Sequence, residues 1–344
     1  MKLSGLSKIL SAQPTYRYQQ INKFVFQDYI SSWEEASNLP KALRAELEQA
    51  CPLEIKAEIM TSGGSKSSRK ALIELIDGET VETVLIKQKG GAEEGQAHRY
   101  TACVSSQVGC PLDCTFCATG QAGYKRNLNA EEIVEQVVFW QRILKAEGKG
   151  EKLDNIVFMG MGEPFLNYTE FIKAAKFLNN PETMNIGARR LSVSTAGIIE
   201  GIKKLSGEKL QINLAISLHS ADDDLRRRLM PVAKKYSLAE IIRASDNYIT
   251  KTGRRVMLEY LMLQGVNDST ADAEKLERLI AGRPLYLVNL IPYNETGRFR
   301  SSSREEIENF RRHLEKQGVA VTVRLSFGAE ITAACGQLRR QASK

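Results

Sequence analysis

Three closely spaced cysteines impose the strongest constraint on this chain. Cys110, Cys114 and Cys117 follow a C-x3-C-x2-C spacing, so one short loop presents three thiolates to a single metal centre. Three thiolates fill three corners of a cubane [4Fe-4S] cluster and leave the fourth iron without a protein ligand. Electron-transfer clusters are normally closed by four cysteines, whereas an open metal position is typical of a site that binds and activates a ligand. The spacing therefore predicts a catalytic iron–sulfur cluster.

A zinc knuckle with a distant fourth ligand is the alternative interpretation of these cysteines. Zinc sites usually combine paired two-cysteine hooks or cysteine–histidine pairs. This chain has no second hook, and its only histidines are His98, His219 and His313. The spacing and the missing partners together favour the cluster over zinc.

The loop resembles the signature of the radical S-adenosylmethionine (SAM) enzymes. The longer string over 103–110, Cys-Val-Ser-Ser-Gln-Val-Gly-Cys, resembles one branch of them, the rRNA/tRNA adenine methyltransferases RlmN and Cfr. The resemblance extends along nearly the whole chain, as far as the string Ala-Cys-Gly-Gln at 334–337. It implies a [4Fe-4S] cluster, two molecules of SAM per turnover, a reducing electron donor such as flavodoxin, and 23S rRNA and tRNA as substrates.

Composition limits the class of protein. The chain has 344 residues, 42% hydrophobic and 26% charged, as in a soluble globular protein. No apolar run approaches the ~20 residues that span a bilayer, and no signal-peptide core follows Met1. Clustered cysteines suit a reducing cytoplasm. We therefore expect a cytoplasmic protein with no membrane partner, and a monomer.

The net charge of +7 points to an anionic partner without identifying one. Many basic residues come as doublets or triplets, among them Arg226-Arg227-Arg228, Lys234-Lys235 and Arg311-Arg312. A basic surface attracts a polyanion such as nucleic acid. Most charge runs are solvated helix faces, so charge alone leaves both interpretations open.

Patterns in the N-terminal third of the sequence predict two small modules. Apolar residues recur at helical spacing within 17–50, with a second helix opening at Pro40. Strict alternation over 53–59 predicts a strand, two more follow near 71–76 and 81–86, and the polar stretch 87–98 reads as a loop. We expect a helical accessory domain over 1–50, a β extension and linker over 51–98, and the catalytic core over 99–344.

From Arg99 onward, strands and helices alternate. Strands are predicted to begin near 99, 154, 190, 210, 255, 285 and 319. Asn129 can cap the helix 130–147, and Ser237 with Glu240 and Ser303 with Glu306 form capping boxes. This alternation predicts an α/β fold with a parallel sheet. The absence of a dinucleotide glycine fingerprint favours a partial (β/α)6 barrel over an open doubly wound sheet.

Unusual residues follow nearly every predicted strand, at the end where barrels of this type hold their active sites. The glycines of Gly160-Met161-Gly162-Glu163-Pro164 permit positive φ or close approach of a ligand, and Glu163 can accept a bond from an ammonium group. The resemblance implies SAM contacts from residues on matching strings: Gly162, Glu163, Ser194, Ser217, Leu218, His219 and Asn294.

Two further cysteines and one carboxylate complete the predicted chemistry. Cys103 and Cys335 could be inert buried thiols, whereas Cys51 matches no motif and reads as structural. The resemblance implies that Cys335 is methylated by SAM and passes its methyl carbon to adenine, after which Cys103 forms a disulfide with Cys335 and releases the base. Glu82 resembles the family's proton acceptor, and partial burial could raise its pKa towards a useful value; the alternative is a carboxylate in water on an edge strand.

A proline in the sequence indicates which adenine carbon, C2 or C8, is methylated. Gly-Met-Gly-Glu followed by Pro164 and Leu166-Asn167 resembles the C2-methylating branch, RlmN, more than the C8-methylating branch, Cfr. We therefore expect C2 methylation of an adenosine in the peptidyl-transferase centre of 23S rRNA and of a tRNA adenosine. The stretches 87–98 and 297–303 depart from the family pattern, which leaves substrate range open. A non-enzymatic, zinc-containing RNA-binding protein is the rival from another class.

Overall fold

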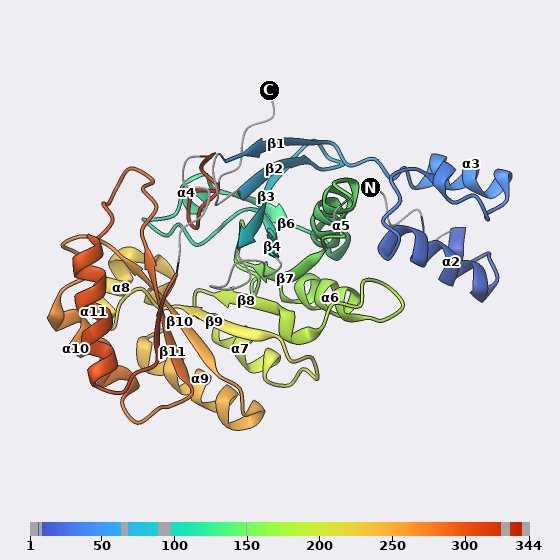
Figure 1. The fold of residues 1–344 in the computed structure, drawn as a ribbon. Helices are drawn as coiled ribbons and strands as arrows, with labels where there is room; N and C mark the ends of the chain where they lie inside the picture. The colour runs from blue at the N-terminus through green and yellow to red at the C-terminus, as the bar shows by residue number, and fades with distance from the viewer. Residues whose placement is uncertain are drawn as a thin grey trace.

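One ten-stranded sheet organises the chain (Figure 1), in the order β1-β2-β3-β4-β7-β8-β9-β10-β11-β12. The computed structural model describes residues 6, 9–62, 68–88, 98–148, 150–324 and 331–338. Neighbouring strands from β4 to β12 pair in parallel, and β1 to β4 pair in antiparallel fashion. Within the described residues β1 and β12 form the two edges, so the sheet remains open, as predicted for a partial barrel.

The parallel strands confirm the predicted rhythm. Each begins within a few residues of its expected position, and the largest shift is at β9, which starts at Asn213 instead of 210. Their interiors are apolar because both faces of a parallel sheet are covered. The strands are β4 (Arg99–Cys103), β7 (Leu153–Phe158), β8 (Leu191–Thr195), β9 (Asn213–Ser217), β10 (Val256–Met262), β11 (Tyr286–Pro292) and β12 (Val321–Val323).

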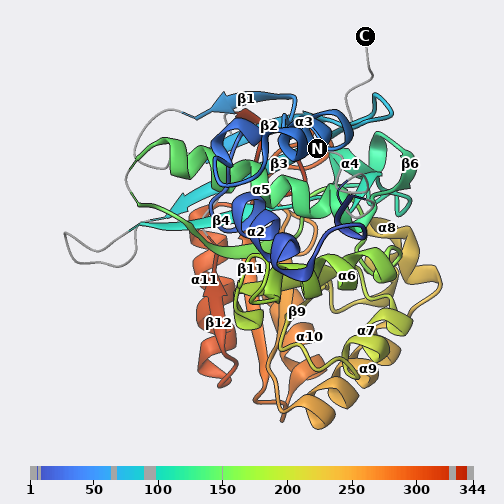
Figure 2. The same cartoon turned by 90° about the vertical axis from the view of Figure 1, so that its right-hand side faces the viewer.

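Helices connect these strands and cover the outside of the sheet (Figure 2). The predicted caps are confirmed: Asn129, Ser237 and Ser303 each form a capping box with the glutamate three residues later. Each box satisfies backbone N–H groups that a helix start leaves without partners. The helices are α4 (Ala118–Gln121), α5 (Ala130–Ala146), α6 (Tyr168–Asn179), α7 (Ile199–Leu205), α8 (Asp223–Leu229), α9 (Leu238–Thr252), α10 (Thr270–Ile280) and α11 (Arg304–Lys316), with 3-10 turns η2 (Ala188–Arg190) and η3 (Pro231–Lys234).

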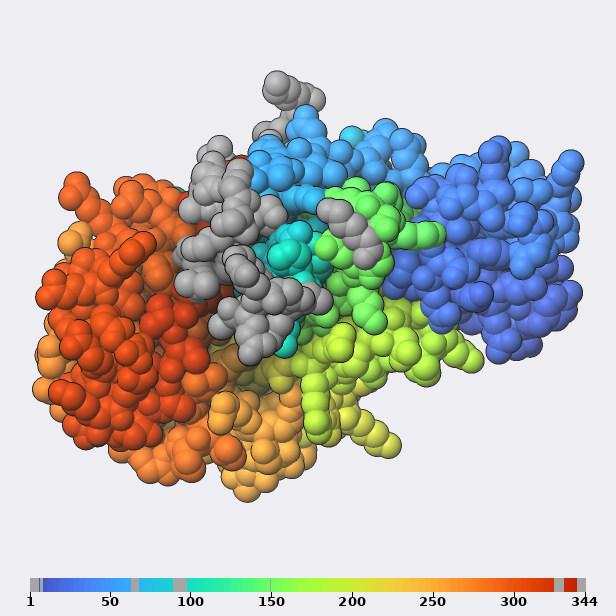
Figure 3. All heavy atoms as spheres, in the orientation of Figure 1, coloured from blue at the N-terminus to red at the C-terminus, as the bar shows by residue number. Residues whose placement is uncertain are grey.

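The N-terminal helices form one end of the molecule, drawn in blue in Figure 3. They are α2 (Thr15–Phe26) and α3 (Lys41–Ala50), joined through the 3-10 turn η1 (Trp33–Glu35). Trp33 is buried and donates from Nε1 to the carbonyl of Cys51 at 2.8 Å. The ring of Phe26 packs edge-on against Phe177 of α6, 4.7 Å away. The apolar core is therefore continuous between these helices and the main sheet.

The three strands expected within 51–98 are present, with different limits. Strand β1 spans Ala57–Thr61, β2 spans Ser68–Glu74 and β3 spans Thr80–Gln88. The strand expected over 53–59 begins four residues late because Leu53 is buried in the core and its carbonyl accepts a bond from Arg142. The loop expected from Lys87 begins later, since β3 includes Lys87 and Gln88; residues 89–97 lie outside the described residues.

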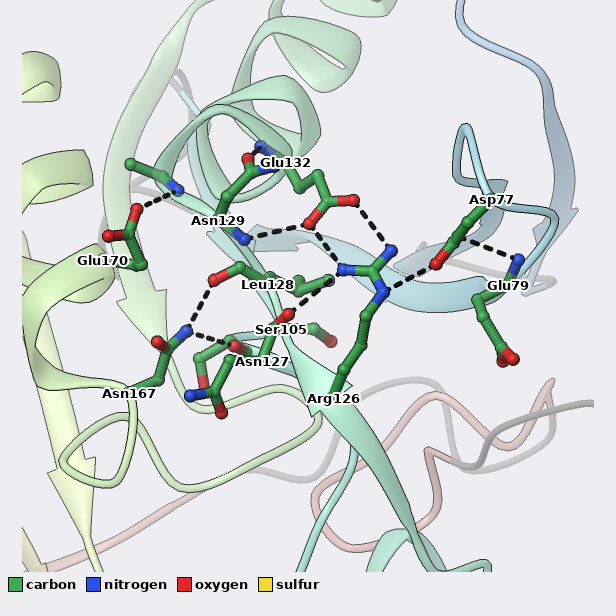
Figure 4. Close-up of polar contacts among 12 residues, drawn as sticks. Asp77, Glu79, Ser105, Arg126, Asn127, Leu128, Asn129, Glu132, Asn167 and Glu170 are labelled. Carbon is green, nitrogen blue, oxygen red and sulfur yellow. Dashed lines mark hydrogen bonds and ion pairs between the residues drawn. The ribbon is translucent and has the colours of Figure 1, made fainter.

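A small hairpin outside the main sheet was not predicted. Strands β5 (Gln107–Gly109) and β6 (Tyr124–Asn127) pair on either side of the cysteine loop. Arg126 fixes this hairpin, because its guanidinium pairs with Glu132 of α5 at 2.9 Å and with Asp77 of the β2–β3 turn at 2.7 Å (Figure 4). The base of the cysteine loop is thereby tied to two other elements. Among the described helices none is both long and apolar enough to cross a lipid bilayer.

Candidate active site at the carboxyl ends of the parallel strands

A cavity of about 220 Å³ opens where the parallel strands end. Loops after β4, β7, β8, β9 and β11 contribute to its wall, as does the segment 331–338 that follows β12 in the chain. All the predicted site residues except Glu82 and Leu218 line it, namely Cys103, Cys110, Cys114, Cys117, Gly162, Glu163, Ser194, Ser217, His219, Asn294 and Cys335. The fold thus brings residues that are far apart in sequence to one place.

The three cysteines of the loop share one wall of this cavity. Burial raises the pKa of Cys110 to about 12 and that of Cys114 well above its usual value, and the nearby charge of Cys117 adds to both. Buried thiols such as Cys110 and Cys114, whose ionisation is opposed by desolvation, suit a metal-bound group, because bound cations stabilise thiolates. Among the described residues, no group of three or more His, Cys, Asp or Glu side chains is arranged so that it could hold a single metal ion. A cubane does not need that arrangement, since each cysteine binds a different iron.

The cysteine loop depends on a glycine where its two ends meet. Gly109 has φ +78°, and a Cβ added there would lie 1.9 Å from the carbonyl oxygen of Gly123. Cys110 donates its backbone N–H to that same carbonyl at 3.0 Å, which closes the loop. On the far side, Thr115 donates to the carbonyl of Leu229 at 2.9 Å and joins the loop to α8.

Glu163 is a buried carboxylate that faces the cavity. Its Oε2 accepts the backbone N–H of Ala196 at 2.7 Å, and its Oε1 accepts that of Phe165 at 3.0 Å. Burial raises the pKa of Glu163 to about 7, against the opposing effect of these two hydrogen bonds. A desolvated carboxylate that is held by neutral backbone donors is well prepared to receive an ammonium group.

Two polar residues outside the predicted site hold the loop of Glu163. Gln107 accepts the backbone N–H of Glu163 at 2.8 Å, and Ser105 accepts that of Met161 at 2.9 Å. Their close approach explains the glycines: a Cβ on Gly160 would lie 2.7 Å from Ser105 Oγ, and one on Gly162 would lie 2.6 Å from Gln107 Cβ. The glycines therefore serve the packing of two loops. The string Ser-Ser-Gln beside Cys103 was the available signal.

The ends of β8 and β9 supply hydroxyl and imidazole groups. Ser194 and Ser217 lie side by side with their oxygens 3.2 Å apart. His219 has φ +58°, and its Nδ1 accepts the backbone N–H of Leu261 at 3.1 Å. Burial lowers the pKa of His219 to about 3, so the ring is neutral and its other nitrogen carries the proton.

Arg226 is buried in the core. Its place in a basic triplet predicts a surface position, and for this residue that interpretation is wrong. Its side chain is fully buried and donates to the carbonyls of Ala196 and Leu218, at 2.7 and 3.1 Å. It therefore ties the ends of β8 and β9 together. Leu218 is also buried in the core, and only its backbone takes part in these bonds. Surface ion pairs with Glu308 further reduce the positive charge available from Arg311 and Arg312.

Cys103 and Cys335 meet at the cavity, and an arginine accompanies them. Burial raises the pKa of Cys103 to about 12, a charge on Cys335 adds to this, and Arg324 opposes it. All six cysteines of the chain are free thiols in this structure. The amide of Asn294 donates to the backbone carbonyl of Cys335 at 3.4 Å. Farther along the segment, the hydroxyl of Thr119 and the N–H of Ala118 bind the carbonyls of Leu338 and Gly336.

Glu82 lies on β3 with its side chain completely buried, which is more than the partial burial expected. The alternative, a carboxylate in water on an edge strand, is wrong, because β3 lies between β2 and β4 in the sheet. Lys70 of β2 donates to its Oε1 at 2.8 Å, with both side chains almost inaccessible to solvent. Glu82 shares a strand face with Ile86 and Gln88, and those two residues do line the cavity. Glu82 is therefore adjacent to the cavity, behind its wall.

Comparison with known proteins places this geometry in a family. The family model described as the radical SAM superfamily matches residues 104–276. The chain is 43% identical over 339 residues to the dual-specificity RNA methyltransferase RlmN of Nautilia profundicola, covering 96% of this chain and 94% of the relative. It is 42% identical over 332 residues to the ribosomal RNA large subunit methyltransferase Cfr of Clostridium botulinum, covering 94% and 92%. This chain belongs to the RlmN/Cfr family of radical SAM proteins.

A solved structure extends this RlmN/Cfr relationship to the fold. The crystal structure of a radical SAM methyltransferase from Sphaerobacter thermophilus superimposes with a TM-score of 0.89 at 42% sequence identity. The match covers 98% of this chain and 97% of the other. The open, mostly parallel sheet is therefore the radical SAM fold, and the resemblance first drawn from the cysteine loop is confirmed over the whole chain.

Proposed function

We propose that this protein methylates C2 of an adenosine in 23S rRNA, and of an adenosine in tRNA, with SAM as methyl donor. The observation that carries the proposal is the cavity that brings together the three loop cysteines, the carboxylate of Glu163 and the pair Cys103 and Cys335. A cluster site, a site for an amino acid group and two extra thiols match the needs of methyl transfer to an unactivated ring carbon. The relatives' names, which specify RNA, supply the substrate class.

Cys110, Cys114 and Cys117 would hold a [4Fe-4S] cluster. Once bound by these cysteines, the cluster would supply the electron for reductive cleavage of SAM to methionine and a 5′-deoxyadenosyl radical. Glu163 binds the ammonium group of SAM, and the backbone at Gly162 lies against the same ligand. The hydroxyls of Ser194 and Ser217, the imidazole of His219 and the amide of Asn294 donate to the carboxylate and ribose.

Cys335 carries the methyl group. Its thiolate attacks the methyl carbon of one SAM molecule, forming a thioether and releasing S-adenosylhomocysteine. A second SAM molecule then provides the radical that removes hydrogen from this methyl, so each turnover uses two. The resulting methylene radical on Cys335 adds to C2 of adenine, and the adduct gives up the C2 proton and one electron, for which the oxidised cluster would be the acceptor. The thiolate of Cys103 then attacks the sulfur of Cys335 and forms a disulfide. The electron pair of the broken S–C bond stays on the methylene carbon, which takes up a proton and leaves as the methyl group of the base.

Glu82 accepts the proton that C2 loses. The position of Glu82 supports this role, because it lies on the same face of β3 as Ile86 and Gln88, which line the cavity. Its pairing with Lys70 keeps a cation beside the carboxylate. The modified base has to enter the cavity, which requires that it be turned out of any helical stack.

The loop 295–303 is the proposed RNA contact at the cavity. It leaves the wall at Tyr293 and Asn294 and is anchored by Thr296, whose hydroxyl donates to the carbonyl of Phe116 at 3.2 Å. Arg298 and Arg300 are exposed on it. Exposed arginines beside an active-site opening are well suited to bind RNA phosphates.

Methylation of C2 rather than C8 is supported by Pro164 within the Glu163 loop. The test is mass spectrometry of adenosines from 23S rRNA and tRNA after anaerobic incubation with SAM and a reductant, with reduced flavodoxin as one donor. The expected product is 2-methyladenosine, absent with the Cys335→Ala variant. Formation of 8-methyladenosine would assign the other carbon. A colourless protein that contains zinc and leaves SAM intact would contradict the proposal. Size exclusion tests the expected monomer.

A further inference from the structure

Lys70 makes an unusual set of contacts for a strand lysine. Its side chain is 4% exposed, and its ammonium donates to Glu82 Oε1 at 2.8 Å, to Thr332 Oγ1 at 3.0 Å and to the Thr332 carbonyl at 3.4 Å. An ammonium has three hydrogens, so these acceptors use all of its capacity. One buried cation therefore joins the strand β3 to the segment 331–338, whose Thr332 lies 262 residues from Lys70 in sequence.

The position of Lys70 in the sheet explains its reach to Glu82. In the β2–β3 register Lys70 lies opposite Val84, and Leu72 lies opposite Glu82. Lys70 and Glu82 are thus diagonal neighbours on one face, a distance that a long side chain can span. The same face continues to Ile86 and Gln88 in the cavity wall.

The backbone of Thr332 indicates that its segment is held in place. Thr332 has φ +51°, a left-handed conformation that is rare for a β-branched residue. Such a conformation persists only where the surroundings impose it. Here both oxygens of Thr332 bind the same ammonium, and its hydroxyl also donates to the carbonyl of Ile331. Cys335 follows three residues later and lines the cavity.

We propose that Lys70 is a positioning residue that holds the segment carrying Cys335 against the strand carrying Glu82. The sulfur that delivers the carbon and the carboxylate that takes the proton act on one base, and Lys70 fixes their relative placement. The roles of Cys335 and Glu82 rest on the proposed function, whereas the link between the two segments rests on the contacts alone. The Lys70 contacts are separate from the bonds by which Ala118, Thr119 and Asn294 hold the later part of the same segment.

The test compares Lys70→Met with Lys70→Arg in the full-length, cluster-loaded protein. Lys70→Met keeps the length of the side chain and removes its charge, and Lys70→Arg keeps a cation. Lys56→Met is the matched control, because Lys56 belongs to the same extension and makes an exposed ion pair with Glu74 at 3.9 Å. Iron content reports that each variant has folded.

Two measurements are made on these variants. Hydrogen–deuterium exchange over 331–338 should accelerate about tenfold or more in Lys70→Met, with little change in Lys70→Arg or Lys56→Met. The ratio of 5′-deoxyadenosine formed to adenosine methylated should rise about tenfold in Lys70→Met, because a misplaced Cys335 wastes radicals, and Lys70→Arg should restore most of the coupling. The inference is wrong if Lys70→Met shows the same exchange rate over 331–338 as the wild type and the same ratio of 5′-deoxyadenosine to methylated adenosine.

A second variant approaches the link from its other end, because breaking one side of a buried ion pair is costly to the fold. Thr332→Val removes the hydroxyl and leaves Lys70 paired with Glu82, while Thr332→Ser keeps the hydroxyl. Faster exchange over 331–338 in Thr332→Val alone supports the link, and equal exchange in both contradicts it. If the exchange results hold but the wild type methylates no adenosine, the proposed function fails and the link stands.

Discussion

The guanidinium of Arg324 lies 3.9 Å from the carboxylate of Glu259, in the cavity wall that also contains Cys103 and Cys335. Glu259 is fixed in turn by Asn289, which donates to it at 2.9 Å. Arg324 and Cys335 both line this cavity, and the charge of Cys335 is the largest cause of the raised pKa of Arg324. A buried carboxylate thus holds a cation beside the two thiols.

Replacement of Arg324 by Met should slow the thiol chemistry. Burial already raises the pKa of Cys103 to about 12 and Arg324 opposes this, so removing the cation raises the pKa further. One pKa unit means about tenfold less thiolate. We expect diamide-driven formation of the Cys103–Cys335 disulfide to slow about tenfold in Arg324→Met and to recover in Arg324→Lys. An unchanged rate in Arg324→Met would contradict this role.

Replacement of any loop cysteine by Ser should abolish the cluster. Cys110→Ser, Cys114→Ser and Cys117→Ser each remove a thiolate that the remaining residues cannot supply, so iron, sulfide and reductive cleavage of SAM should be lost. Cys51→Ala is the matched control, since Cys51 is buried in the N-terminal module away from the cavity. Iron analysis and the visible spectrum measure the outcome. Full iron content in a loop variant would show that the cluster is held elsewhere.

The binding of SAM should weaken in acid. Burial raises the pKa of Glu163 to about 7, so the carboxylate is mostly protonated at pH 6 and mostly ionised at pH 8. Only the ionised form attracts an ammonium group. The Kd for SAM should therefore rise from pH 8 to pH 6, approaching about tenfold per pH unit below 7. Glu163→Gln should bind weakly at both pH values; the same pH dependence in that variant would rule out Glu163 as its source.

Gly162 should not tolerate a side chain. Gly162→Ala places a Cβ 2.6 Å from that of Gln107 and requires a φ of +100°. We expect a loss of about 1–3 kcal/mol in the free energy of unfolding and weaker SAM binding. Gly187→Ala is the control, because no atom lies within 4 Å of a Cβ there, and it should change stability by no more than about 0.5 kcal/mol. Equal denaturation midpoints for the two variants would contradict the packing argument.

The arginines of the loop 295–303 should contribute to RNA affinity through charge. Arg298→Ala/Arg300→Ala should weaken binding to a 23S rRNA fragment and reduce the slope of log affinity against log salt by about two. Arg311→Ala/Arg312→Ala removes equal charge from residues already paired with Glu308 and should have a smaller effect. Filter binding at several salt concentrations measures both. Equal slopes would place the RNA elsewhere.

The parallel strands and the cavity were predictable because their signals are local. Each strand is a short apolar run that ends in residues unsuited to a strand, and parallel strands place those ends together. The positions of Cys110, Glu163 and Ser217 after their strands predict a shared location, and all three line the cavity. The capping boxes were equally local, since Ser237 and Glu240 lie within one helical turn.

The supporting contacts were not predictable, because they join residues distant in sequence. Nothing near Arg226 indicates that it is buried between β8 and β9, unlike Arg227 and Arg228 beside it. Alternation placed Glu82 on a strand face but could not reveal that Lys70 would pair with it and would also bind Thr332. The predicted start of β1 was too early, because the alternating pattern already begins at Leu53. In the structure Leu53 packs into the core and is not part of the strand.

The segment 331–338 follows the entire sheet in the order of synthesis. A ribosome therefore releases the strands and loops of the cavity wall before it releases Cys335. We expect a chain that is clipped after β12 to keep a cluster pocket that can still generate radicals, with no sulfur to receive them. Proteolytic loss of residues 324–344 would then convert a methyl-transfer catalyst into a source of oxidative damage to itself.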